Sequence, residues 1–204
     1  METKELILKK ALDMFAKSGY DSVSIRDIAK AVNIKESSIY YHFKNKQDIL
    51  DSLVEKFESH MKELTDMLQA SMSDSHHVNA FSWDWLREFY FEQYLFDTFC
   101  NQMMRFMMIE QFHNENMRML YERYLFELPH KIQTQSFMML SKLGILSEQQ
   151  AIKVSNDFFA SITMLTFKYL LNGKLTKTKK EAFSEETFTY INRMFQEDWI
   201  CQIY

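Results

Sequence analysis

Apolar residues recur along this chain with the three-to-four-residue period of α-helices. In the first segment this spacing is met by Ile7, Ala11, Met14 and Phe15. It predicts a helix over residues 4–18, with Thr3 as its cap and Gly19 as its stop.

The next segment predicts a second helix and a tight turn. Ser24 and Asp27 match a capping box, in which the two side chains satisfy free backbone N–H groups at a helix start. Ala29 is small enough to let a third helix cross closely, and Asn33 tolerates the left-handed backbone that such a turn needs. With Ile39 as an apolar plug, the pattern indicates a helix-turn-helix.

From residue 47 the pattern continues in longer helices. One amphipathic helix runs to about residue 71, and the segment 83–112 has apolar residues on so many faces that we expect one central helix. Pro129 is expected to start a further helix, which ends near Gly144.

Two more helices are predicted near the end of the sequence. Ser147 and Gln150 form a second capping box for a helix that reaches Asn172. The last helix is expected over residues 185–203, with Ser184 as its cap.

Composition supports an all-α protein. The chain has 204 residues, of which 47% are hydrophobic, so it can bury a substantial core. Three Gly and one Pro leave little turn chemistry for hairpins, which favours long helices over strands.

Charge is distributed unevenly. Residues 1–46 contain nine Lys or Arg against six Asp or Glu, a net of +3, whereas the whole chain has a net charge of −4. The basic excess therefore lies with the helix-turn-helix, as expected if that segment meets nucleic acid. Cys100 and Cys201 form no metal-binding pattern, and no apolar run is long enough for a bilayer, so we expect a reduced, cytoplasmic protein without membrane contact.

The segment ALDMFAKSGYDSVSIRDIAKAVNIKESSIYYHFKNKQDIL resembles the N-terminal domain of the TetR (tetracycline repressor) family of bacterial regulators. The resemblance implies a three-helix DNA-binding head over residues 1–46, and a larger helical bundle over residues 47–204 for ligand binding and dimerisation. It further implies a homodimer, joined through the last two helices, that binds a palindromic double-stranded DNA operator. A small apolar or aromatic effector would release the DNA.

Carried over position by position, the resemblance assigns DNA contacts to nine residues: Ser24, Arg26, Lys35, Ser37, Ser38, Tyr40, Tyr41, His42 and Lys46. Ser24, Arg26 and Lys46 would hold phosphates, and the others would line the recognition helix in the major groove. Two residues depart from the family pattern. Asn33 stands in place of the usual Gly, and Lys35 stands where Ser or Thr commonly caps the third helix.

The Met- and aromatic-rich body is the candidate effector site. Its proposed lining consists of Phe89, Met103, Met107, Phe112, Tyr121, Tyr124, Phe159 and Met164. Ordinary core packing is the competing explanation for most of these side chains.

Other chemistry finds little support in the sequence. Glu110 and His113 have the Glu-x-x-His spacing of di-iron bundles, which require further inward-facing carboxylates, so we interpret it as accidental. His76 and His77 are adjacent in a polar stretch and are better explained as solvated loop residues than as metal ligands. Nucleotide-binding and hydrolase fingerprints are missing, so we predict neither an enzyme nor a cofactor. A ligand-independent or activating regulator, and a helical enzyme or metal carrier, remain alternatives.

Overall fold

The computed structural model describes residues 2–73 and 86–199, and these contain helices and turns but no strand. The predicted all-α class is therefore confirmed, with a helix-turn-helix near the N-terminus. His76, His77 and Cys201 lie outside the described residues.

The chain divides into two compact units, which are described separately. One unit comprises residues 1–74 and 98–120, and the other comprises residues 75–97 and 121–204. The predicted functional boundary after residue 46 stays a prediction, because this structural division follows packing.

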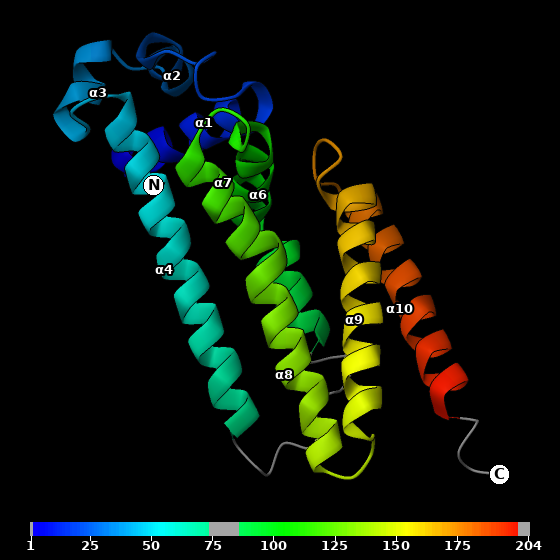
Figure 1. Ribbon diagram of the computed structural model, residues 1–204. Coiled ribbons are helices and arrows are strands. Elements are labelled where there is room, and N and C mark those ends of the chain that lie inside the picture. The colour runs from blue at the N-terminus through cyan, green and yellow to red at the C-terminus, as the bar shows by residue number, and fades with distance from the viewer. Residues whose placement is uncertain (1, 74–85, 200–204) are drawn as a thin grey trace. The chain divides into compact units, whose positions relative to one another are not determined.

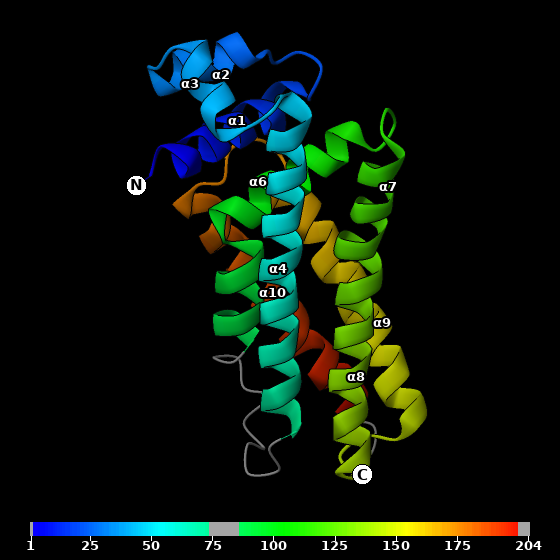
Figure 2. The same cartoon turned by 90° about the vertical axis from the view of Figure 1, so that its left-hand side faces the viewer.

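The first unit contains the head and three further helices. Its helices are α1 (Thr3–Ser18), α2 (Ile25–Val32), α3 (Glu36–His42), α4 (Lys46–Ser73), α6 (Thr98–Glu110) and most of α7 (Glu115–Glu122). Figure 2 shows α1, α2 and α3 gathered at the N-terminal end of α4. Phe15 is fully buried and stacks on Phe106 of α6, with ring centroids 5.4 Å apart. This contact ties the head to α6 within one core.

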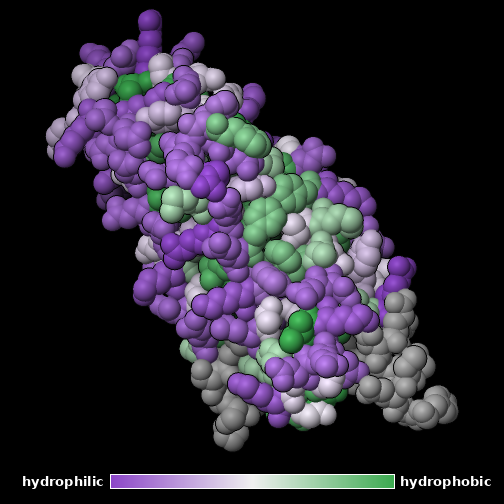
Figure 3. All heavy atoms as spheres, viewed as in Figure 1, coloured by the Kyte–Doolittle hydropathy of each residue, from purple (hydrophilic) through white to green (hydrophobic). Residues whose placement is uncertain are grey.

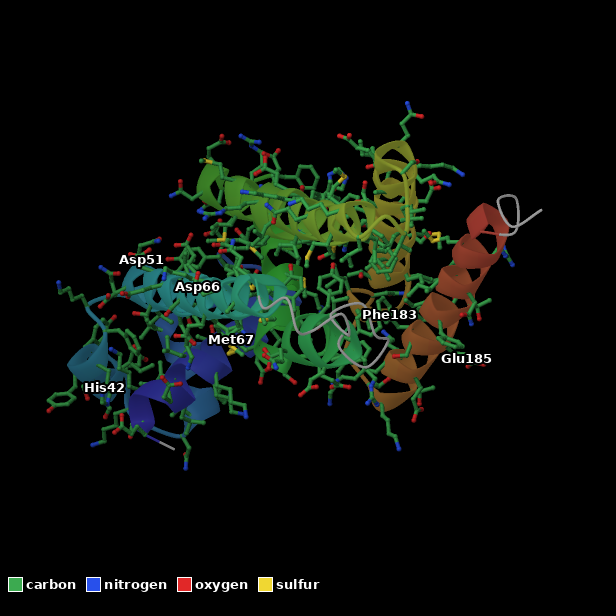
Figure 4. All side chains as sticks on the ribbon, turned by 90° about the horizontal axis from the view of Figure 1, so that it is seen from below. His42, Asp51, Asp66, Met67, Phe183 and Glu185 are labelled. Atoms are coloured by element: carbon green, nitrogen blue, oxygen red, sulfur yellow. The ribbon has the colours of Figure 1, made fainter. Side chains whose placement is uncertain are left out.

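The described residues of the second unit form three α-helices and three π-helical segments. They are η2 (Leu86–Leu95), η3 (Arg123–Glu127), α8 (Leu128–Lys142), α9 (Glu148–Leu165), η4 (Thr166–Leu170) and α10 (Lys177–Trp199). Helices α8 and α9 lie side by side (Figure 1) and meet through Phe137 and Phe158, whose centroids are 5.6 Å apart. On α10, Phe183 is buried, and its ring centroid lies 5.1 Å from that of Phe91. Glu185, two residues later, is exposed (Figure 4).

Several predicted element boundaries are wrong. The segment 83–112 is not one helix, because η2 ends at Leu95 and α6 begins at Thr98. The last helix begins at Lys177, where Thr176 Oγ1 accepts the Lys179 N–H at 3.3 Å, so Ser184 lies inside the helix and is not its cap. Thr3 is likewise the first helical residue, with Glu2 at the cap position and no side-chain cap.

Pro129 lies in the first turn of α8, as predicted, but it does not interrupt the helical backbone before it. The two residues before it, Glu127 and Leu128, keep right-handed helical backbone angles, and η3 runs directly into α8. Pro lacks an N–H and its ring crowds the carbonyl four residues earlier, which normally breaks an α-helix. Here the wider π-helical turn of η3 precedes it, and such turns accommodate an interrupted hydrogen-bond ladder.

Other local signals are confirmed. Both capping boxes form with reciprocal hydrogen bonds, at Ser24 with Asp27 and at Ser147 with Gln150. Gly144 and Gly173 follow their helices with positive φ angles. No helix among residues 2–73 and 86–199 has the length and apolar character required to cross a bilayer.

Candidate nucleic-acid interface

The turn between α2 and α3 has the geometry of a helix-turn-helix. Asn33 adopts φ 61° and ψ 46°, and within the described chain it is the one non-glycine residue with positive φ. Its N–H and that of Ile34 close the end of α2 by bonding carbonyls of Lys30 and Ala29. Ala29 is 2% exposed and Ile39 is fully buried, so the close crossing of α2 and α3 depends on a small residue and an apolar plug.

Helix α3 presents polar and aromatic groups outward. Tyr40 is 54% exposed and Tyr41 is 86% exposed, an unusual degree for aromatic side chains. Lys35 and Ser37 are exposed, while Ser38 and His42 are half-buried. The surface of the head visible in Figure 3 is dominated by hydrophilic residues. A short helix with exposed hydroxyls and a lysine at its N-terminal end can enter a major groove and hold phosphates.

The two predicted phosphate contacts at the start of α2, Ser24 and Arg26, differ in how their donors are used. The Ser24 N–H and hydroxyl donate to Asp27, at 2.9 and 2.5 Å, and these hydrogen bonds lower the pKa of the Asp27 carboxyl. Arg26 is largely exposed and lies 3.9 Å from Glu36, a long ion pair that leaves its guanidinium accessible.

A set of contacts around Tyr20 joins the head to α6. The Tyr20 N–H donates to Glu110 Oε1 at 2.8 Å, and the Lys46 ammonium donates to the Tyr20 carbonyl at 2.9 Å. Lys46 also lies 4.0 Å from the centre of the Tyr20 ring. Gly19 has φ +79°, and a Cβ there would lie 2.9 Å from Glu110 Oε1. We call Gly19, Tyr20, Lys46 and Glu110 the head brace.

The Tyr20 hydroxyl completes this network. It donates to Gln47 Oε1 at 3.2 Å. Burial raises the pKa of Tyr20, and the negative charges of Asp21, Asp51 and Glu110 raise it further, so the hydroxyl stays protonated at neutral pH. The head is thus held to α4 and α6 by hydrogen bonds that do not use the outward face of α3.

Sequence reasoning missed most of the head brace. Glu110 is 90 residues from Tyr20 in the chain, and its only local signal was the Glu-x-x-His spacing. In the structure its carboxylate is buried and faces Tyr20, while His113 is exposed. Lys46 was predicted to hold phosphate; it is half-buried in the brace, and its phosphate contact stays a prediction.

Glu127 and His130 repeat the Glu-x-x-His spacing. Glu127 is exposed, and the His130 ring nitrogen Nε2 is 2.9 Å from Asn156 Oδ1. The His130 ring packs 4.7 Å from Phe159. These contacts are those of a helix-packing histidine.

The predicted effector-site residues are divided between the two units. Met103 and Met107 are fully buried in α6 of the first unit, and Phe112 is 82% exposed in the turn after it. Tyr124 is buried in the second unit, Tyr121 and Phe159 are half-buried there, and Met164 is 47% exposed. The side chain of Phe89 lies outside the described residues. A shared ligand site for these residues stays a prediction.

Comparison with known proteins matches this head to a family. Residues 7–53 match the model of bacterial regulatory proteins of the tetR family. The head of this chain is therefore similar to that of TetR-family regulators. Over 94 residues it is 36% identical to the biofilm operon icaADBC HTH-type negative transcriptional regulator IcaR of Staphylococcus aureus (strain Newman). That match covers 46% of each protein, so the chain spans about half the length of the curated relatives it matches.

Solved structures extend the similarity of fold over nearly the whole chain. A TetR-family regulator from Mesorhizobium loti superposes with a TM-score of 0.64 at 13% identity, covering 95% of both chains. A regulator from Saccharomonospora viridis, solved in complex with choline, superposes with a TM-score of 0.61 at 20% identity, covering 93% of this chain and 95% of that one. At these identities the likeness establishes the TetR-type fold alone.

Proposed function

We propose that this protein is a ligand-responsive transcriptional repressor that binds a palindromic operator as a homodimer. The observation that carries the proposal is the outward face of α3, where Tyr40 and Tyr41 are exposed beside Lys35 and Ser37 on a head of TetR type. The related IcaR is named as a negative regulator, which favours repression over activation. On this basis the protein is cytoplasmic and has no enzymatic role.

Dimerisation through α9 and α10 is part of this proposal. Large apolar side chains on these helices are 44–47% exposed: Ile152, Met164 and Phe188. Exposed apolar residues of this size on adjacent helices favour a protein interface. A dimer would place two α3 helices about 34 Å apart, one turn of DNA, so that both enter the major groove on one face.

An effector would act through its unequal affinity for two arrangements of the dimer. The solved regulator from Saccharomonospora viridis binds choline, which supports small-molecule binding in proteins of this fold. A ligand that favours a spacing other than one DNA turn weakens operator binding by that difference in affinity.

Footprinting on the DNA that flanks the protein's own gene tests the function. We expect protection of a palindrome whose half-sites are one helical turn apart. Absence of protection at moderate salt, with the dimer intact by sedimentation, would contradict repression. A ligand-independent regulator would protect the site, and none of the compounds tested would release it. An activator would protect the site and raise transcription.

A second measurement tests the phosphate contacts. Tyr40→Phe removes one hydroxyl from an exposed side chain without affecting the core. If Tyr40 holds a phosphate, affinity falls by a similar factor for all DNA sequences, because phosphates carry no sequence information. A loss confined to certain base pairs would show that Tyr40 reads a base instead. Lys46→Ala does not test a phosphate contact by itself, because it also removes a hydrogen bond of the head brace.

A further inference from the structure

The second unit contains a buried side-chain amide, one of whose polar atoms has no hydrogen-bond partner among the described residues. Gln133 of α8 is 6% exposed, and its Nε2 donates to the Tyr90 hydroxyl of η2 at 3.1 Å. Its Oε1 is enclosed and accepts no hydrogen bond from any residue that the structure describes. Buried polar atoms in proteins are nearly always paired, so this amide oxygen is suited to accept a hydrogen bond from a bound molecule.

Reversing the amide does not remove the problem. With oxygen and nitrogen exchanged, the Tyr90 hydroxyl would donate to Oε1, and the amide NH₂ would then lack an acceptor. One end of the Gln133 amide is unmatched in either orientation. A hydroxyl group suits both cases, because it can donate to an oxygen or accept from a nitrogen.

The described rings beside this amide are those of Tyr90, Phe91 and Tyr94 of η2. The Tyr90 ring lies 5.8 Å from that of Tyr94 and 6.0 Å from that of Phe91. Burial raises the pKa of Tyr90, so its hydroxyl is neutral at physiological pH. The buried polar residues described in this unit are all uncharged: Gln133, Ser136, Ser155, Thr166 and Thr187. None of these buried residues could act as a counter-ion, so burial at the Gln133 amide favours an uncharged ligand.

The backbone around the cluster is irregular in a way that suits a binding site. Tyr90 and Tyr94 lie on η2, and the Tyr94 hydroxyl donates to the carbonyl of Tyr124 on η3, so two π-helical segments meet beside α8. π-Helical turns are rare and frequently occur at functional sites.

We propose that Gln133 and Tyr90 form the polar end of an effector site for an uncharged aromatic molecule that carries a hydroxyl group. The ligand hydroxyl donates to Gln133 Oε1, and the ring packs among the aromatic side chains of η2. This inference rests on the proposed ligand-responsive function and specifies the chemical class of the effector. Gln133 and Tyr90 were not among the residues that the sequence suggested.

Binding of a matched pair of probes to the free full-length protein tests this. 2-Naphthol and 2-methylnaphthalene have nearly the same shape, but only the first carries a hydroxyl. Calorimetric titration should show that the wild-type protein binds 2-naphthol about tenfold more tightly, the effect of one hydrogen bond to a buried group. In Gln133→Leu this ratio should fall to about one while the affinity for 2-methylnaphthalene is kept, and Tyr90→Phe should lower the ratio in part.

Two further readouts separate ligand recognition from a purely structural role. The control Gln149→Leu, at an exposed position of α9, should leave the ratio unchanged. Without ligand, Gln133→Leu should change the melting temperature little, because it removes an unpaired amide oxygen and also leaves the Tyr90 hydroxyl without its donor. If Gln133 serves only to hold Tyr90, the variant loses stability and the probe ratio stays at its wild-type value.

The inference is overturned if the probe ratio is the same in Gln133→Leu as in the wild type, or if 2-naphthol fails to bind the wild-type protein up to its solubility limit. Neither result involves DNA. A protected operator together with either result would refute this effector class and leave the proposed repressor function standing. If the probe ratio depends on Gln133 but the protein protects no operator, the effector class is supported and the proposed repressor function is refuted.

Discussion

At the scale of single residues, Gly19 is restricted by its backbone and by its surroundings at once. Its φ of +79° is one that residues with a Cβ rarely adopt, and a Cβ would lie 2.9 Å from Glu110 Oε1. Glu110 is buried and holds the Tyr20 N–H, so its carboxylate has little room to withdraw. The sequence showed this glycine only as a helix stop, whereas the structure makes it part of the contact between the head and α6.

Gly19→Ala should therefore destabilise the protein by about 2–4 kcal/mol, the sum of backbone strain and a disturbed buried hydrogen bond. Urea denaturation followed by circular dichroism measures this change. Gly144→Ala is the matched control, because Gly144 has a similar φ of +72° but an added Cβ there would meet no atom within 4 Å. It should lose only the backbone part, about 1 kcal/mol. Equal losses in the two variants would show that the contact with Glu110 contributes nothing.

At the scale of elements, the two helices of the helix-turn-helix differ in how they begin. Helix α2 has a complete capping box, with Ser24 and Asp27 bonding each other's backbone N–H groups. Helix α3 is preceded by Lys35, whose backbone angles suit a cap but whose side chain makes no cap hydrogen bond. The helix assigned to the major groove is thus the less well anchored of the two at its N-terminus.

Replacing Lys35 separates capping from charge. Lys35→Ser adds a cap and should stabilise the protein by about 1 kcal/mol, whereas Lys35→Ala adds none. If Lys35 holds a phosphate, both variants should lower by about one the slope of log affinity against log salt. Thermal unfolding and operator titrations at several salt concentrations measure the two effects. An unchanged salt slope in both variants would remove Lys35 from the phosphate contacts.

The capping box of α2 makes stability depend on pH in a defined direction. Hydrogen bonds from Ser24 lower the pKa of Asp27 below its usual 3.8, so the folded state favours the charged carboxylate. This contribution is complete above pH 3.8 and is lost as the pH falls through the lower value of the folded protein. The difference in melting temperature between the wild type and Asp27→Asn should therefore be constant near neutral pH and shrink on acidification towards and below pH 3.8. A difference that grows on acidification would contradict the assignment.

At the scale of the whole molecule, the proposed repressor function requires two copies of the chain. Ile152, Met164 and Phe188 lie exposed on α9 and α10, where the family resemblance predicts the dimer interface. The head itself contributes one recognition helix, so a palindromic operator is bound tightly only when two heads are joined.

Phe188→Arg should convert the dimer into a monomer, since burying an unpaired charge in an apolar interface is costly. Sedimentation velocity measures the change, and operator affinity should fall with it. Leu143→Arg is a suitable control, because Leu143 is 56% exposed but lies in the turn after α8. It should remain dimeric. A dimeric Phe188→Arg variant would place the interface elsewhere.

The sequence by itself determined the features that depend on neighbouring residues. The capping boxes at Ser24 and Ser147, the left-handed Asn33 and the all-α class follow from local backbone chemistry and from apolar periodicity, and the structure confirms each of them. Local signals predicted helix breaks or starts wrongly where a longer helix runs through the position. Pro129 stands in the first turn of α8, as predicted, but does not break the helical backbone, because η3 widens the turn before it. Helix α10 begins at Lys177, with Thr176 at the cap position that Ser184 was expected to take.

Only the tertiary structure decided which distant side chains meet. Glu110 reaches Tyr20 across 90 residues, and Gln133 reaches Tyr90 across 43, and no periodicity or spacing encodes either pair. Burial gives these contacts their importance, because a carboxylate or amide removed from water must find a partner in the fold or in a ligand. The sequence therefore specified the helix-turn-helix of the head, whereas the head brace and the buried Gln133 amide emerged only from packing.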